Sequence, residues 1–154
     1  MATRSLGCTA RRGTSPLELL VVIVAASLVL AAAVPAACGA LDAAAVAGAA
    51  RRIASAHVRA RMTAIMESRT TLLTITADSL VIRIVAGTDT IVRWRDRGPG
   101  VQSIALTGPT RAMRFSPVGI MAGVTNGTWR LSRGAAQRNV IVSRLGRLRV
   151  VRPP

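Results

Sequence analysis

The hydrophobic positions of the chain begin with one long uninterrupted run. Residues 19–34 contain no charged side chain, and as an α-helix they would extend roughly 24 Å at ~1.5 Å per residue. Continuing the helix to Leu41 gives the length needed to cross the ~30 Å hydrocarbon core of a bilayer. The pattern therefore predicts a membrane-spanning helix over residues 14–41.

Beyond this run the apolar positions take on the spacing of an amphipathic helix. The segment from Ala43 to Met66 has no Pro. Its bulky apolar side chains recur on one helical stripe, which comprises Val58, Met62, Ile65 and Met66. Most of its arginines fall off that stripe, namely Arg51, Arg52, Arg59 and Arg61. The pattern predicts a helix over residues 43–68 that packs through the stripe against the C-terminal part of the chain, with its arginines in solvent.

From Thr70 onward the period of the pattern changes to two, which is typical of β-strands. The alternating apolar positions are Leu73 and Ile75, Leu80 to Ile84, Ile91 to Trp94, Ile104 and Leu106, Met113 and Phe115, Trp129 and Leu131, and Val140 to Val142. Gly98-Pro99-Gly100 interrupts the pattern, and Asn126-Gly127 is predicted to form a tight hairpin turn. We expect the aromatic residues among these positions to fill the core.

Together these patterns predict an α+β fold. One long N-terminal helix would pack on an antiparallel sheet of about seven or eight strands, formed by residues 70–152. The 154 residues suffice for one domain of ordinary size.

The charge of the chain is strongly unbalanced. All 21 basic residues are Arg, and the formal net charge is +15. The six acidic residues are Glu18, Asp42, Glu67, Asp78, Asp89 and Asp96. Such a chain attracts anions, including phosphates and acidic lipid headgroups.

No set of residues with catalytic spacing is present in the sequence. The acids after Glu18 are scattered, with no close pair for acid–base work. Cys8 and Cys38 predict neither a disulfide nor a zinc site, and the single His57 is interpreted as an ordinary residue of a helix face. We therefore expect no enzyme activity, no metal and no cofactor.

The residues around the apolar run indicate its orientation in the membrane and the kind of N-terminal signal to which it belongs. Arginines precede it at positions 4, 11 and 12, which places the N-terminus in the cytoplasm and the rest of the chain outside. An ordinary signal peptide cut near Ala36-Ala37 and a lipoprotein signal using Cys38 are two interpretations. Neither accounts for Glu18, because a carboxylate at the start of an apolar run is costly to bring into a membrane.

A third interpretation accounts for Glu18. The stretch resembles the N-terminal cleavage and methylation motif of type IV pilins and type II secretion pseudopilins. In that register Gly13 precedes the cut, Thr14 is the first mature residue, Glu18 is the fifth and Pro35 is the twenty-second. The resemblance implies a leader over residues 1–13, and a Glu18 that pairs with the N-terminal amine of a neighbouring subunit. Thr14 stands where the family usually has Phe.

The C-terminal half carries a second resemblance. Its segments are Arg114 to Gly119, Thr128 to Leu131, Asn139 to Ser143 and Gly146 to Val150. In this order they look like the GspH/FimT family of minor pseudopilins and minor pilins. The resemblance implies that residues 42–154 form a periplasmic GspH-like domain.

A cluster of arginines near the C-terminus is the candidate binding site. It comprises Arg144, Arg147, Arg149 and Arg152. In a strand Arg147 and Arg149 would share one face, about 7 Å apart, and the cluster could neutralise phosphates. In the DNA-uptake branch of the family such a tail is associated with DNA binding. The alternative is a solvated edge strand whose charges discourage aggregation.

The sequence is thus interpreted as a minor pseudopilin of a type II secretion system. Its expected partners are a prepilin peptidase, other pseudopilins or pilins and the inner membrane, which it would cross once. The alternatives are a minor type IV pilin that binds DNA for uptake, and a plain membrane-anchored periplasmic β domain.

Overall fold

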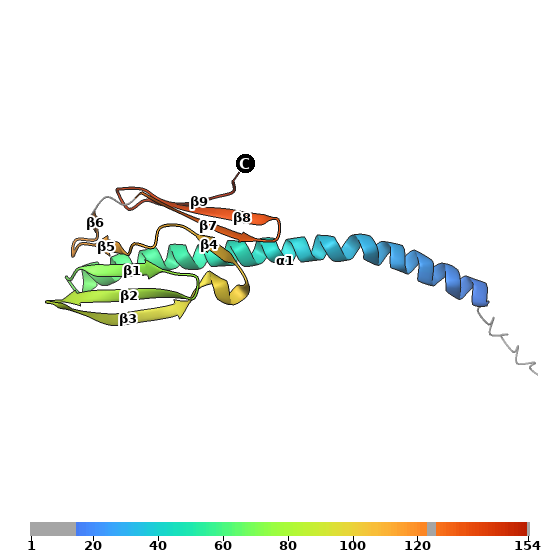
Figure 1. Cartoon of the computed structure of the whole chain (residues 1–154), viewed down its shortest axis with the longest axis horizontal. Helices are drawn as coiled ribbons and strands as arrows, with labels where there is room; N and C mark the ends of the chain where they lie inside the picture. The colour runs from blue at the N-terminus through green and yellow to red at the C-terminus, as the bar shows by residue number, and fades with distance from the viewer. Residues whose placement is uncertain (1–14, 123–125, 154) are drawn as a thin grey trace, which may run out of the picture. The chain divides into compact units, whose positions relative to one another are not determined.

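The computed structural model describes residues 15–122 and 126–153, which form one helix, one short 3-10 helix and nine strands (Figure 1). The elements in chain order are α1 (Pro16–Met66), β1 (Thr71–Ile75), β2 (Ser79–Ala86), β3 (Asp89–Arg97), η1 (Pro99–Gln102), β4 (Ala105–Thr107), β5 (Met113–Phe115), β6 (Met121–Ala122), β7 (Gly127–Arg133), β8 (Ala136–Val142) and β9 (Leu148–Val151). The chain divides into two compact units, residues 1–37 and 38–154, and α1 contributes to both.

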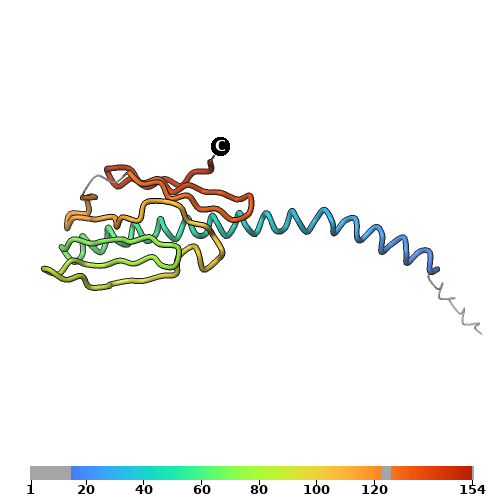
Figure 2. The backbone as a smooth tube through the Cα atoms, viewed as in Figure 1, coloured from blue at the N-terminus to red at the C-terminus, as the bar shows by residue number. Residues whose placement is uncertain are grey.

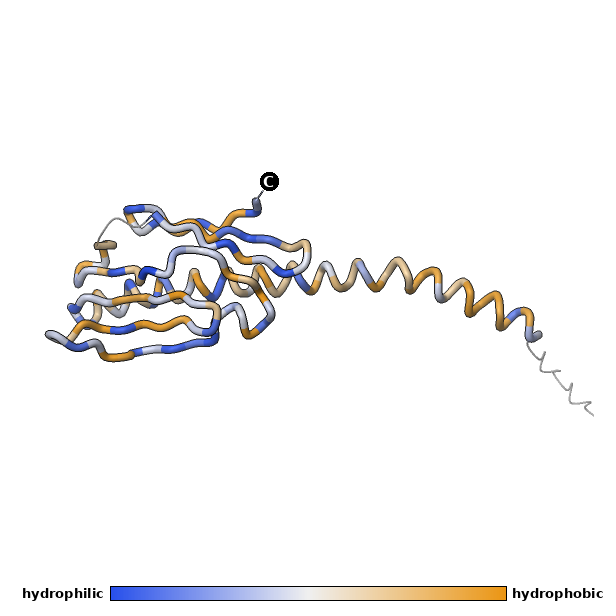
Figure 3. Tube along the Cα trace, in the orientation of Figure 1, coloured by the Kyte–Doolittle hydropathy of each residue, from blue (hydrophilic) through white to orange (hydrophobic). Residues whose placement is uncertain are grey.

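In the first unit the described residues form the N-terminal part of α1. The Ser15 hydroxyl accepts a hydrogen bond from the Leu17 N–H at 3.4 Å, and Pro16 occupies the first helical position. Both choices suit a helix start, because the first N–H groups of a helix have no partner within it. The apolar side chains of this part are exposed. Figure 3 shows this part of α1 mainly in orange, the colour of hydrophobic residues.

In the second unit the strands form two antiparallel sheets. The first has the order β3-β2-β1-β5-β6, and the second has the order β4-β7-β8-β9. The β2–β3 hairpin turns at Gly87, whose φ of +67° glycine adopts without strain. The part of α1 from Cys38 onward lies beside both sheets, which can be followed in the trace of Figure 2.

The hairpin predicted at Asn126-Gly127 is wrong. Gly127 begins β7 and pairs with Val142 of β8, while β6 belongs to the other sheet. The tight turn of this region joins β7 to β8 instead, and Gly134 with φ +54° lies in it.

The core is built on an alanine-rich face of α1. Its buried helical residues are Val46, Ala49, Ala50, Ile53, Ala56, His57, Ala60 and Ala64. Small side chains let the strands approach the helix closely, and larger ones from the sheets fill the space, among them Leu73, Phe115 and Trp129.

The prediction that the stripe of Val58, Met62, Ile65 and Met66 packs against the rest of the chain is therefore wrong. Its four residues are 40–79% exposed, with Ile65 the least and Met66 the most exposed. The physical reason is that close approach to two sheets favours the face with the smallest side chains over the face with the largest ones. Phe115 and Trp129 are buried as expected, whereas Trp94 is only half-buried, with the Arg59 guanidinium 5.0 Å from its ring centroid.

The predicted fold class is confirmed: a long N-terminal helix packs on antiparallel β-structure. The described residues contain nine strands in two sheets rather than seven or eight in one. β6 was not among the predicted strands, because at two residues it is too short to show an alternating pattern.

Candidate functional site

The proposed cleavage site lies outside the described residues. Gly13 and Thr14 are both in the undescribed N-terminal segment. Glu18 is exposed in the first turn of α1, where a negative charge is favoured by the helix dipole. Pro35 lies inside α1, in the first unit, and the helix continues past it.

The N-terminal part of α1 has the length and composition of a membrane span. In the described part of the chain, α1 is the one helix that is long and apolar enough to cross a bilayer, and its most apolar window is not buried at all. The first charged residue after Glu18 is Asp42. These facts fit a single-pass anchor.

The structure separates the predicted arginine cluster into two places. Arg144 lies in the β8–β9 turn, Arg147 directly precedes β9, and Arg149 lies in β9; all three are exposed. The turn is closed by hydrogen bonds from the Gly146 N–H to the Ser143 carbonyl oxygen at 2.9 Å, and from the Arg147 N–H to the Ser143 hydroxyl at 3.2 Å.

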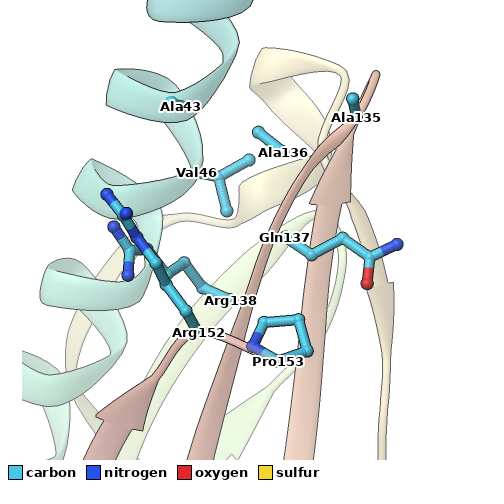
Figure 4. Close-up of a pocket in the computed structure, with 8 residues that line it drawn as sticks. All are labelled: Ala43, Val46, Ala135, Ala136, Gln137, Arg138, Arg152 and Pro153. Carbon is cyan, nitrogen blue, oxygen red and sulfur yellow. The ribbon is translucent and has the colours of Figure 1, made fainter.

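Arg152 lies at the opposite end of β9, which at ~3.4 Å per residue is about 17 Å from Arg147. There it lines a cleft of about 540 Å³ together with Arg138, which lies two residues after the start of β8 (Figure 4). The cleft lies between the β8–β9 end and α1, and its other lining residues are Ala43, Val46, Ala135, Ala136, Gln137 and Pro153. Sequence reasoning missed Arg138.

Two arginines of the second unit are engaged in ion pairs among the described residues. Arg133 Nε lies 2.8 Å from Asp42 Oδ1, and Arg93 binds both carboxylate oxygens of Glu67, with Nε 3.0 Å from Oε1. The Glu67 carboxylate raises the pKa of Arg93, first by hydrogen bonding and then by its charge. None of the arginines that the structure describes is buried, so they leave a large positive excess on the surface of the described residues.

His57 lies on the buried face of α1. It is 4% exposed, and its ring packs edge-on against Phe115 with ring centroids 5.1 Å apart. Burial lowers its pKa, and the nearby Arg61 charge lowers it further. Its Nε2 is buried without a hydrogen-bond partner in the described structure. No group of three or more potential metal ligands occurs in the described residues.

An exposed apolar helical segment that continues into the core of an antiparallel β domain defines a pilin-like protein. Comparisons with known proteins narrow the class. The family model described as type II transport protein GspH matches residues 49–146, and the chain belongs to this family. This confirms the family resemblance seen in the sequence.

Solved structures show the same fold at low sequence identity. The type IV minor pilin FimU of Pseudomonas aeruginosa (strain PAO1) matches with a TM-score of 0.56 and 16% identity, over 71% of this chain and 88% of the other. A second crystal form of FimU gives a TM-score of 0.55 and 16% identity, over 68% and 90% of the two chains. No curated protein matches the chain.

The family sets the general role of the chain. Its members are structural subunits rather than enzymes, and they assemble with other pilins or pseudopilins. These findings support the role of a pseudopilin or minor pilin.

Proposed function

We propose that the chain is a minor pseudopilin of a type II secretion system, which assembles near the tip of a periplasmic pseudopilus. The observation that carries the proposal is the exposed apolar half of α1, which precedes a domain of the GspH family. Such a helix needs a membrane before assembly and neighbouring helices afterwards.

The proposed path begins in the inner membrane, with the N-terminus in the cytoplasm. A prepilin peptidase cuts after Gly13 and leaves a free amine on Thr14. Glu18 then pairs with the Thr14 amine of a neighbouring subunit, because a carboxylate within the apolar part of an assembly requires a positive partner. This pair sets the axial register of the subunits, and Pro35 accommodates the packing of the helix among its neighbours.

The test is co-expression with a prepilin peptidase, followed by mass measurement of the N-terminus. We expect a product that begins at Thr14, and Gly13→Val should prevent its formation. A chain that keeps residues 1–13, or that is cut near Ala37, contradicts the proposal.

Assembly is tested separately by cross-linking in cells that carry the other pseudopilins. Glu18→Ala should be cleaved normally but should cross-link less to its neighbours, whereas Glu18→Asp should restore part of the cross-linking. Unchanged cross-linking of Glu18→Ala would remove the proposed register role.

One observation favours a second candidate, a minor type IV pilin that binds DNA. Arg144, Arg147 and Arg149 gather at one exposed turn, and no ion pair in the described structure involves them. Duplex DNA titrated into the full chain in neutral detergent should then bind more weakly as salt rises, with a slope of about −0.9 per phosphate contacted.

The matched variants are Arg147→Ala with Arg149→Ala, and Arg95→Ala with Arg97→Ala on β3. The first pair should weaken DNA binding and flatten the salt slope, and the second pair serves as a control of equal charge. No binding at low salt, or equal effects of both pairs, would contradict a DNA site at the turn. If cleavage also fails, the plain membrane-anchored domain is the remaining interpretation.

A further inference from the structure

The β7–β8 turn lies against Asp42, the residue that follows the apolar part of α1. Asp42 is the first charged residue after the run, and its carboxylate pairs with Arg133 at 2.8 Å. Gly134 lies so close that an added Cβ would stand 2.5 Å from Asp42 Oδ2. The strand end that carries Arg138 therefore lies beside the beginning of α1 in the second unit.

The pairing of β8 with β9 brings two arginines together there. The last pair of the ladder joins Asn139 to Val151, so the next positions outward are Arg138 and Arg152. Like charges at opposite cross-strand positions repel each other. Both residues line the same cleft between β8 and α1, and Figure 4 shows both side chains extending along it toward α1.

No acidic residue lines the cleft or pairs with either arginine among the described residues. Two guanidinium groups offer planar sets of N–H donors that match the oxygens of a phosphate. An anion between them would replace their repulsion with attraction. The other walls are formed by the apolar residues Ala43, Val46, Ala135, Ala136 and Pro153 and by the polar Gln137.

We propose that this cleft, defined by Arg138 and Arg152, binds the phosphate of an anionic lipid headgroup. The inference rests on the proposed function only in taking the N-terminal part of α1 as the membrane anchor. Ala43 and Val46 lie two and five residues after Leu41, which along a helix is about 3 and 7.5 Å. The headgroup layer extends ~5–7 Å beyond the hydrocarbon core on each side, so the cleft begins at headgroup depth.

This position distinguishes the cleft from the arginines of the β8–β9 turn. The turn lies beside the far part of α1, since Gly146 and Ile65 line one cavity, whereas the cleft adjoins Ala43. A lipid in the cleft would hold the domain at the membrane surface before assembly, and transfer into a filament would have to release it. Duplex DNA has easier access to the turn than to a site at headgroup depth.

The test uses the full chain in neutral detergent and native mass spectrometry with added phosphatidylglycerol or phosphatidylcholine. We expect one retained phosphatidylglycerol in preference to phosphatidylcholine. An arginine near an anionic lipid surface strengthens binding about fivefold. Arg138→Gln combined with Arg152→Gln removes two such arginines and should therefore reduce the preference for phosphatidylglycerol roughly 30-fold. Arg152 lies just after the end of β9, so Arg152→Gln alone should leave the fold unchanged. This single variant should reduce the preference for phosphatidylglycerol about fivefold.

Arg147→Gln with Arg149→Gln is the control of equal charge and should keep the preference. Equal losses in both double variants would show only a general charge effect and would overturn the inference. Two further arms add inorganic phosphate or duplex DNA in excess. Displacement of the lipid by phosphate alone would indicate a free-anion site, and displacement by DNA would indicate a nucleic-acid site; either result overturns the lipid assignment.

A separate measurement tests whether the N-terminal part of α1 anchors the chain in the membrane. If alkaline carbonate extracts the chain from cell membranes, the proposed anchor fails whatever the lipid preference is. If the chain stays in the membrane but shows no preference for phosphatidylglycerol, the cleft inference alone fails.

Discussion

Replacement of His57 by Leu should remove a pH dependence from the stability of the second unit. His57 is the single histidine of the chain and is 4% exposed in the core. Burial and the Arg61 charge lower its pKa from the ordinary value of 6.5. The neutral ring is therefore the form that the folded protein holds at neutral pH.

The sign of the effect is set by proton binding. Below about pH 6.5 the unfolded chain takes up a proton that the folded chain resists, so acid favours unfolding. The free energy of unfolding should fall by up to ~1.4 kcal/mol for each pH unit below 6.5, until the folded-state pKa is reached. Above pH 7 this contribution is fully present and constant.

The assay is urea unfolding of the full chain in neutral detergent, followed by circular dichroism from pH 7.5 to pH 5. The difference between wild type and His57→Leu should be constant above pH 7 and should grow in favour of the variant below pH 6.5. Arg61→Gln should raise the pKa of His57 and so reduce the acid sensitivity. Parallel pH profiles for wild type and His57→Leu would refute the reasoning.

Three other substitutions test the packing of the second unit by the same unfolding assay. Trp129→Ala should cost about 3–5 kcal/mol, because the side chain is 1% exposed and its Nε1 donates to the Pro109 carbonyl oxygen at 3.2 Å. Gly134→Ala should cost on the order of 1–2 kcal/mol for its φ of +54°, and should also displace Asp42. Asp42→Asn should cost less than about 1 kcal/mol, since Asp42 and Arg133 are 25% and 38% exposed; a larger loss would mean that this pair fixes the turn.

The fold could be predicted from the sequence wherever a local pattern of residues was enough to determine whether a segment forms a helix or a strand. The uncharged run and the Pro-free segment after it predicted the long helix, and period two predicted the buried positions of β1, β2, β5 and β7. The buried face of α1 could not be predicted in this way. Hydrophobicity favours Met62 over Ala60, but the spacing between helix and sheets decides burial, and that spacing is not a local property of the sequence.

The candidate site was predicted only in part for a similar reason. Arg147 and Arg149 are neighbours in the sequence and stay close in the fold. Arg138 and Arg152 are 14 positions apart and become neighbours only through the register of β8 and β9. Four arginines within nine residues suggested a single site. In the structure β9 is extended, so that Arg144, Arg147 and Arg149 lie near its beginning and Arg152 lies at its other end.

The alanine-rich face of α1 has a mechanical consequence. One continuous helix carries the apolar N-terminal part and also supplies the core residues from Val46 to Ala64. A pull along this helix would load its contacts with the sheets in shear, so that many contacts resist together rather than one after another. Alanine side chains project too little to interlock with the sheets and so resist sliding only weakly. The larger side chains of Ile53 and His57 project further and would resist sliding more.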